Sequence, residues 1–141
     1  FTNEIDIAYF LKENTARNAL IFAPHVKFHW PNYTERLVIV PILTANKLQF
    51  DSKKIFSEMI KLSHIMFEEG AFEKYWMLQY KGRDMDAKKY RRRFWEIMDK
   101  DKIYEIKKHY PIDYVIREKS LLLDGLEKYY ENKSYIVYKI D

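Results

Sequence analysis

The chain has 141 residues, of which 48% are hydrophobic and 17% aromatic, and its 25 basic and 21 acidic side chains leave a formal net charge of +4. This length and apolar content suffice for one hydrophobic core, so we expect a single α/β domain over residues 1–141. The absence of cysteine excludes thiol catalysis, thiolate metal sites and disulfides. No run of the sequence approaches the roughly 20 apolar residues that a membrane-spanning helix needs.

The N-terminal part of the chain predicts one helix followed by two strands. Apolar residues at helical spacing behind a capping-type Asn3 indicate a helix over residues 3–13. The apolar runs over residues 19–23 and 37–40 each stop at a proline, which suits buried strands because proline lacks the backbone donor. We expect these two strands to lie side by side, joined by the aromatic connection over residues 25–33.

The middle of the chain, Phe50 to Lys108, predicts helices. Its apolar residues recur at helical spacing, and Asp86 suits the cap of one helix. The spacing of Ile103 and Ile106 predicts another helix, which ends before Pro111.

The end of the chain predicts two closing strands. Asp113-Tyr114-Val115-Ile116 is one, and Tyr135–Ile140 is the other, separated by a short helical or irregular link. We expect the last strand at a sheet edge, because Tyr138 and Lys139 tolerate solvent. The order of elements favours a three-layer, Rossmann-like α/β domain with a small, mostly parallel sheet, an edge strand at the C-terminus and a helical insertion in the middle.

Residues at both ends of the chain resemble a recurring pattern of a known kind of domain. Its residues are Asn14-Thr15 shortly before a strand that ends at Pro24, the strand Asp113–Ile116, and the closing segments Tyr130-Glu131-Asn132 and Tyr138-Lys139. With the leading helix, this combination resembles the C-terminal extracytoplasmic domain of bacterial polytopic membrane proteins of the glycosyltransferase-C type and of related uncharacterised families. The helical middle carries no motif that aligns.

The resemblance implies a context and a function. The chain would be a piece excised from a longer protein, attached to the membrane part of the same polypeptide and located at the extracytoplasmic face of a bacterial membrane. No catalytic residue carries over from the family to this chain, and no cofactor is implied. We therefore expect a non-catalytic soluble domain that assists a glycosyltransferase-like membrane part.

The connection between the first two strands contains the best candidate site, formed by His25, His29, Trp30 and Tyr33. Loops beyond the carboxyl ends of strands are where open α/β sheets place their pockets, and these aromatic rings could stack on a sugar. The alternatives are a hydrophobic cover over the sheet, or a metal site if a carboxylate such as Glu35 came near. Two histidines alone are an incomplete ligand set, so we predict no metal.

The strongest basic cluster lies at Lys88, Lys89 and Arg92, interleaved with Tyr90 and Phe94. Helical geometry turns the aromatic residues inward and the three basic ones outward, as on an ordinary solvated amphipathic helix. Anionic lipid headgroups are the favoured partner of such a face, ahead of nucleic acid, because acidic neighbours dilute the positive field.

A second functional hypothesis comes from a different class of protein. The chain would be a free-standing module that binds a small ligand or a carbohydrate through the connection from His25 to Tyr33. This hypothesis predicts a ligand affinity that falls when His29 or Trp30 is replaced, whereas the membrane-protein hypothesis predicts no turnover by the isolated chain.

Overall fold

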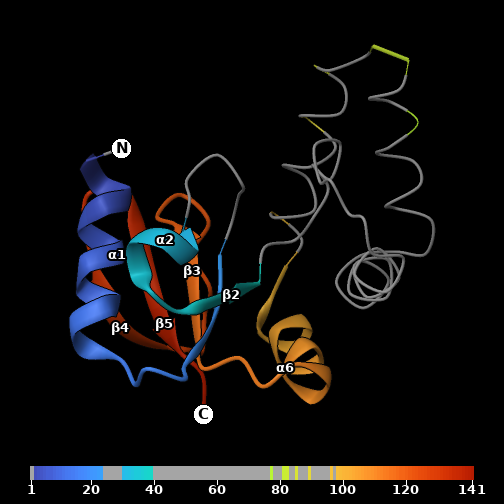
Figure 1. The fold of residues 1–141 in the computed structure, drawn as a ribbon. Helices are drawn as coiled ribbons and strands as arrows, with labels where there is room; N and C mark the ends of the chain where they lie inside the picture. The colour runs from blue at the N-terminus through green and yellow to red at the C-terminus, as the bar shows by residue number, and fades with distance from the viewer. Residues whose placement is uncertain are drawn as a thin grey trace. The chain divides into compact units, whose positions relative to one another are not determined.

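The computed structural model describes residues 2–23, 30–39, 77, 81–82, 85, 89, 96 and 98–141. Contacts divide the chain into two compact units, Phe1–Val40 with Lys107–Asp141, and Pro41–Ile106. The described elements are α1 (Thr2–Asn14), β1 (Leu20–Phe22), α2 (Trp30–Thr34), β2 (Leu37–Ile39), α6 (Lys100–His109), β3 (Tyr114–Glu118), β4 (Glu127–Glu131) and β5 (Tyr135–Lys139) (Figure 1). Most of the second unit lies outside the described residues, so the single domain with a helical insertion stays a prediction.

The five strands form one mixed sheet in the order β2-β1-β3-β5-β4. Strand β1 pairs in parallel with β2 and with β3, which confirms that the first two strands are neighbours. Strand β5 pairs antiparallel with both β3 and β4, and these two antiparallel ladders contain most of the paired residues. The prediction of a mostly parallel, Rossmann-like sheet is therefore wrong for the C-terminal half. Three residues join β4 to β5, and a parallel pair needs a crossover of a dozen or more.

The prediction of an edge strand at the C-terminus is also wrong, because β5 lies between β3 and β4. Tyr138 is fully buried, and its hydroxyl accepts a hydrogen bond of 3.0 Å from the Leu123 amide. The edge belongs to β4, in the segment that sequence patterns assigned to an irregular link. A β-bulge between Lys128 and Tyr130 disrupts the period-two alternation of β4, so consecutive tyrosines, Tyr129 and Tyr130, both contact the Phe10 ring of α1.

Helices α1 and α2 cover one face of the sheet (Figure 1). Ile7, Ala8 and Leu11 of α1 are fully buried there, as the helical spacing of the sequence predicts. The strands contribute alternate residues to the same cluster, which are Ile21, Ala23, Tyr114, Ile116, Tyr135 and Val137. This apolar layer is the main core of the unit that joins the two ends of the chain.

The intervening strand residues face the opposite side of the sheet and are buried as well. They are Phe22, Val115, Arg117, Ile136 and Tyr138. The guanidinium of Arg117 donates from Nε to the Leu121 carbonyl at 2.7 Å, and burial lowers the pKa of Arg117 to about 10. An arginine with this pKa stays charged at neutral pH, so its contact with the Leu121 carbonyl fixes the chain just after β3.

The C-terminal end of α1 is held by Arg36, which precedes β2. Its Nη2 donates to the carbonyl oxygens of Lys12 at 2.8 Å and Thr15 at 2.9 Å, and its Nε donates to the Thr15 hydroxyl at 3.1 Å. A guanidinium satisfies the orphan carbonyls at this end of a helix and complements the negative end of the helix dipole. Arg36 therefore joins the start of β2 to the end of α1.

Helix α6 confirms the prediction that rests on Ile103 and Ile106, both fully buried. Asp99 caps its start, with Oδ1 accepting a hydrogen bond of 2.9 Å from the Lys102 amide. Basic residues fill the last turn, where Lys107 donates to the Ile112 carbonyl at 2.9 Å. The helix ends at His109, two residues before Pro111.

Candidate functional site

Only part of the sequence-predicted site can be placed. His25, His29, Lys88 and Arg92 lie outside the described residues. Lys89 is described and exposed, as expected of a solvated helix face. The ligand-binding and headgroup-binding assignments of these residues stay predictions.

Trp30 and Tyr33, which the sequence grouped as aromatic ligand contacts, occupy different environments in α2. Trp30 is 0% exposed and packs edge-on against Tyr135, with ring centroids 6.0 Å apart. A ring without an exposed face cannot stack on a sugar, so the ligand assignment of Trp30 is corrected to a core residue that covers the sheet. Tyr33 is 43% exposed and keeps a ring available to solvent.

The described residues contain no group of three or more His, Asp or Glu side chains that could hold a metal ion. Glu35, the carboxylate considered as a third ligand, has Oε1 3.5 Å from the Lys12 ammonium. The structure thus gives Glu35 an ion pair on the surface of α1, and it adds no observation in favour of a metal at the histidines.

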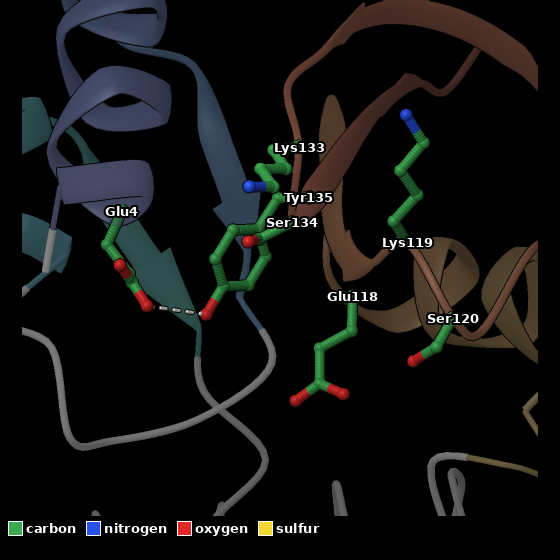
Figure 2. Close-up of a pocket in the computed structure, with 7 residues that line it drawn as sticks. All are labelled: Glu4, Glu118, Lys119, Ser120, Lys133, Ser134 and Tyr135. Atoms are coloured by element: carbon green, nitrogen blue, oxygen red, sulfur yellow. Dashed lines mark hydrogen bonds between the residues drawn. The ribbon is translucent and has the colours of Figure 1, made fainter.

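A pocket of about 320 Å³ opens where β3 ends and β5 begins, beside the first turn of α1 (Figure 2). Its lining residues are Glu4, Glu118, Lys119, Ser120, Lys133, Ser134 and Tyr135. Because β1 and β3 are parallel, the carboxyl ends of both strands lie at this edge of the sheet. Open α/β sheets place ligand sites at such an edge, so we take this pocket as the candidate site.

The hydroxyl of Tyr135 is the central polar group of the pocket. It donates a hydrogen bond of 2.9 Å to Glu4 Oε1, and Figure 2 draws it between the carboxylates of Glu4 and Glu118. Burial raises the pKa of Tyr135 well above its usual value, and the nearby negative charges of Glu4 and Glu118 add to the effect. The phenol stays protonated at neutral pH, so it serves as a hydrogen-bond donor and cannot act as a base or nucleophile.

The turn between β4 and β5 fixes one wall of the pocket. Asn132 Oδ1 accepts hydrogen bonds of 2.9 Å from the amides of Ser134 and Tyr135, as in an Asx turn. The Asn132 amide nitrogen donates to the Asn3 carbonyl at 2.9 Å and to Asp6 Oδ2 at 3.0 Å. Because its oxygen bonds the turn and its nitrogen bonds α1, the Asn132 side chain positions the turn against the first turn of α1.

Asn3 adds a second link to the same turn. Its side chain donates to the Ser134 hydroxyl at 2.7 Å, which differs from the capping role that the sequence predicted. We call Asn3, Glu4, Asp6, Tyr130, Asn132, Ser134 and Tyr135 the polar clasp, because they hold the start of α1 on the β4–β5 hairpin.

Two carboxylates, Glu4 and Glu118, and two lysines, Lys119 and Lys133, line the pocket. The Lys119 ammonium lies 3.4 Å from Glu131 Oε2 and points away from the Tyr135 hydroxyl in Figure 2. In Figure 2 the Glu118 carboxylate and the Ser120 hydroxyl point to the side opposite the Lys119 ammonium. The Lys119 ammonium is therefore committed to Glu131, and the lining combines hydrogen-bond donors and acceptors.

Sequence reasoning missed the pocket because its residues are ordinary polar types without a motif spacing. Glu4 and Glu118 are 114 positions apart in the chain. They line one pocket because Glu118 pairs with Tyr135 across the β3–β5 ladder and the Tyr135 hydroxyl is bonded to Glu4. The available signal was positional: Glu118, Lys119 and Ser120 follow a strand of the parallel half, at the edge where such sheets bind ligands.

Comparisons with known proteins identify no relative: no family model, curated protein or solved structure matches this chain. Among the described residues, no helix has the length and apolar character needed to cross a membrane.

Proposed function

We propose that this chain is a non-catalytic soluble domain at the extracytoplasmic face of a bacterial membrane protein, and that it assists a glycosyltransferase-like membrane part of the same polypeptide. The observation that carries the proposal is that the two ends of the chain belong to one compact unit. The segments that bear the resemblance lie at the two ends of the chain, and residues 1–40 and 107–141 fold together. A resemblance to a single domain that is carried by both ends of the chain requires that the two ends fold into one domain.

The use of the polar groups also supports a non-catalytic role. The side chains of the polar clasp form hydrogen bonds that hold α1 against the hairpin. The raised pKa of Tyr135 keeps its hydroxyl protonated. Catalytic acids and bases instead need a pKa near the working pH. The clasp is therefore better suited to stability and ligand contact than to turnover.

The finer account of the fold belongs to this proposal. The described half-sheet β2-β1-β3 has the parallel pairing of a doubly wound domain, and the face of the sheet opposite α1 is buried. These two features support a three-layer arrangement, onto which the β4–β5 hairpin adds an antiparallel extension.

Cysteine labelling of the full polypeptide in its native membrane tests the proposed location, because this chain has no cysteine of its own. Lys128→Cys places a thiol on the exposed surface of β4. We expect it to react with a membrane-impermeant maleimide in intact spheroplasts, and we expect the protein in the membrane fraction. The matched control Ala8→Cys, at a fully buried position, should react only after denaturation. Labelling of Lys128→Cys only after lysis, or recovery of the protein from the soluble fraction, would contradict the proposal.

Contact of Lys88, Lys89 and Arg92 with anionic lipid headgroups is part of the same proposal. Exposure of Lys89 supports it, since a headgroup contact needs an accessible ammonium. Cosedimentation with vesicles that contain phosphatidylglycerol should exceed that with phosphatidylcholine alone, and Lys89→Glu should reduce the difference. Equal cosedimentation with both vesicles would exclude the contact.

The alternative function, a free-standing carbohydrate-binding module, rests on Tyr33 within the described residues. Its ring is 43% exposed and lies in α2, close in sequence to His29. A glycan array probed with the chain and with Tyr33→Ala tests this alternative. Binding that disappears in the variant would support it, and an array without any bound glycan would exclude it.

A further inference from the structure

We propose that Asp124-Gly125, in the turn that leads into β4, is a modification site at which the aspartate isomerises to isoaspartate in the folded chain, and that this change loosens the start of β4. The site shares no residue with the pocket or with the connection between His25 and Tyr33. The proposal does not depend on the proposed membrane location.

The sequence singles out one position for this reaction. Asp124-Gly125 is the only aspartyl-glycyl or asparaginyl-glycyl pair in the chain, because the other two glycines follow Glu69 and Lys81. Glycine has no Cβ, so its backbone nitrogen can approach the carboxyl group of the preceding side chain without a steric clash. A branched side chain on the following residue, such as Ile7 after Asp6, hinders the same approach.

The structure places this pair in an exposed turn. Asp124 and Gly125 are both exposed, and Gly125 has a φ of 80°, as the third residue of a type II turn requires. Among the described residues, no hydrogen bond or ion pair holds the Asp124 carboxylate. This side chain can therefore change rotamer and bring its Cγ to the Gly125 nitrogen.

The reaction needs only water and no oxidant, reductant or cofactor. The Gly125 nitrogen attacks Cγ of the protonated Asp124 carboxyl group, a new C–N bond forms, and the carboxyl hydroxyl leaves as water with the amide proton. Water then opens the resulting succinimide ring at the main-chain carbonyl carbon of Asp124 and breaks the original peptide bond there. The product is isoaspartate, whose main chain runs through Cβ and Cγ, and the elemental composition of the chain is unchanged.

Isoaspartate lengthens the main chain between two segments that are held to different degrees. Before the turn, Leu123 is buried, and its amide donates a hydrogen bond of 3.0 Å to the Tyr138 hydroxyl. After the turn, the edge strand β4 begins with two exposed residues, Glu127 and Lys128. Because the segment with fewer buried contacts opens at a lower free energy, the added length displaces the start of β4 and leaves Leu123 in place.

Incubation of the 141-residue chain in neutral buffer, followed by tryptic digestion and mass spectrometry, tests the proposal. Electron-transfer fragmentation distinguishes isoaspartate from aspartate in the peptide 120–128. We expect isoaspartate to form there at least about tenfold faster than at Asp6, where Tyr130 and Asn132 hold the carboxylate and Ile7 follows. Asp124→Glu is the matched variant, since it keeps the charge but must close a larger ring, and its peptide should contain no isomer.

Ile21→Ala separates reaction in the folded chain from reaction after global unfolding. The substitution removes a buried core side chain and should raise the unfolded population by about a hundredfold. Because the turn is already exposed in the folded chain, the rate at Asp124 should stay within about twofold of that in the unmodified chain.

Hydrogen exchange of the incubated sample measures the effect on β4, because the aspartyl and isoaspartyl forms of a peptide separate by chromatography. In a peptic peptide that contains residue 124 and β4, the isoaspartyl form should have exchanged more of its β4 amides. Three outcomes would overturn the proposal: isoaspartate at Asp124 no faster than at Asp6, a rate that rises with the unfolded population, or equal exchange of β4 in both forms. None of them bears on the membrane location, which cysteine labelling tests separately.

Discussion

The two halves of the sheet are stabilised in different ways. In the parallel half, β1 and β3 bury apolar side chains on both faces, with Ile21, Phe22 and Val115 fully buried. In the antiparallel half, the outer strand β4 has no fully buried residue, and hydrogen bonds of Tyr130 and Asn132 join the hairpin to Asp6 of α1. Burial therefore stabilises the centre of the sheet, β5 included, whereas the edge strand β4 is held by polar contacts and by the packing of Tyr129 and Tyr130 on Phe10.

This difference explains where the pocket lies. A ligand site needs polar groups that are held in place, and a wholly apolar region offers none. The pocket opens where the two halves meet, with Glu118 at the end of β3 and Tyr135 at the start of β5. Polar groups come from both sides of this junction: Glu118, Lys119 and Ser120 from the end of β3, and Lys133, Ser134 and Tyr135 from the hairpin.

Removing apolar volume from the parallel half should have the largest effect on stability. Ile21→Ala deletes a fully buried side chain from the core cluster under α1 and should lower the free energy of unfolding by about 3 kcal/mol. Chemical denaturation followed by circular dichroism measures the change. Leu37→Ala in the neighbouring β2 is the control, because Leu37 is 70% exposed and its loss should cost less than about 0.5 kcal/mol. Equal effects would contradict the assignment of β1 to the core.

Removing the organising amide of the hairpin should have the next largest effect. Asn132→Ala leaves the Ser134 and Tyr135 amides without their acceptor and breaks the link to Asn3, so we expect a loss of about 2 kcal/mol by the same measurement. Asn14→Ala, an exposed asparagine at the other end of α1, should change stability by less than about 0.5 kcal/mol. A negligible effect of Asn132→Ala would show that the polar clasp contributes little.

Tyr135→Phe removes the hydroxyl that donates to Glu4 and should cost about 1 kcal/mol at neutral pH. The same variant should change the alkaline response. Because the pKa of Tyr135 is raised in the folded chain, its proton is held more tightly there than in the unfolded chain. Its stabilising contribution is present below pH 10, the ordinary tyrosine pKa, and is lost as the pH rises above it.

Denaturation midpoints measured between neutral and alkaline pH check this sign. The unmodified chain should lose stability above the ordinary tyrosine pKa more steeply than Tyr135→Phe does. Tyr9→Phe, at a position that is 55% exposed, should leave the profile unchanged. Identical alkaline slopes for all three proteins would contradict the raised pKa.

The smallest effect is expected at the end of α2, where Glu35 has a positive φ of 54°. A non-glycine residue in this left-handed region is strained, so Glu35→Gly should stabilise the chain by about 0.5 kcal/mol after the entropy of the more flexible unfolded state is subtracted. Loss of the exposed ion pair with Lys12 offsets little of this gain. Thermal denaturation measures the shift, and a clear decrease in Tm would contradict the account.

The parallel half of the sheet could be predicted from the sequence because its strands are short apolar runs that end at prolines or follow a helix. Strand β1 lies within residues 19–23 and β2 within residues 37–40, as the patterns indicate. The neighbouring helix α1 also follows its apolar spacing closely. Burial on one or both faces leaves a periodic signal, and this signal is what sequence reasoning detects.

In the antiparallel half, β5 was predicted as a strand over Tyr135–Ile140, but β4 and its pairing were missed because the signal of β4 is disrupted and polar. Strand β4, Glu127–Glu131, has charged residues at both ends and a bulge that breaks its alternation, so it resembles a link. The position of β5 inside the sheet depends on that missed strand. The pocket depends on the same pairing, since Glu118 and Ser134 become neighbours only through the β3–β5 ladder and its extension.

Native-state hydrogen exchange of the chain tests the contrast between the two halves most directly. The account predicts that the most protected amides of β1 and β3 exchange with the highest opening free energies in this unit, and that those of β4 exchange through a smaller opening. Asn132→Ala should lower the opening free energy of β4 by about 2 kcal/mol more than that of β1. Equal protection of β1 and β4, lowered equally by the substitution, would contradict the claim that the polar clasp holds the edge strand β4 on an apolar scaffold.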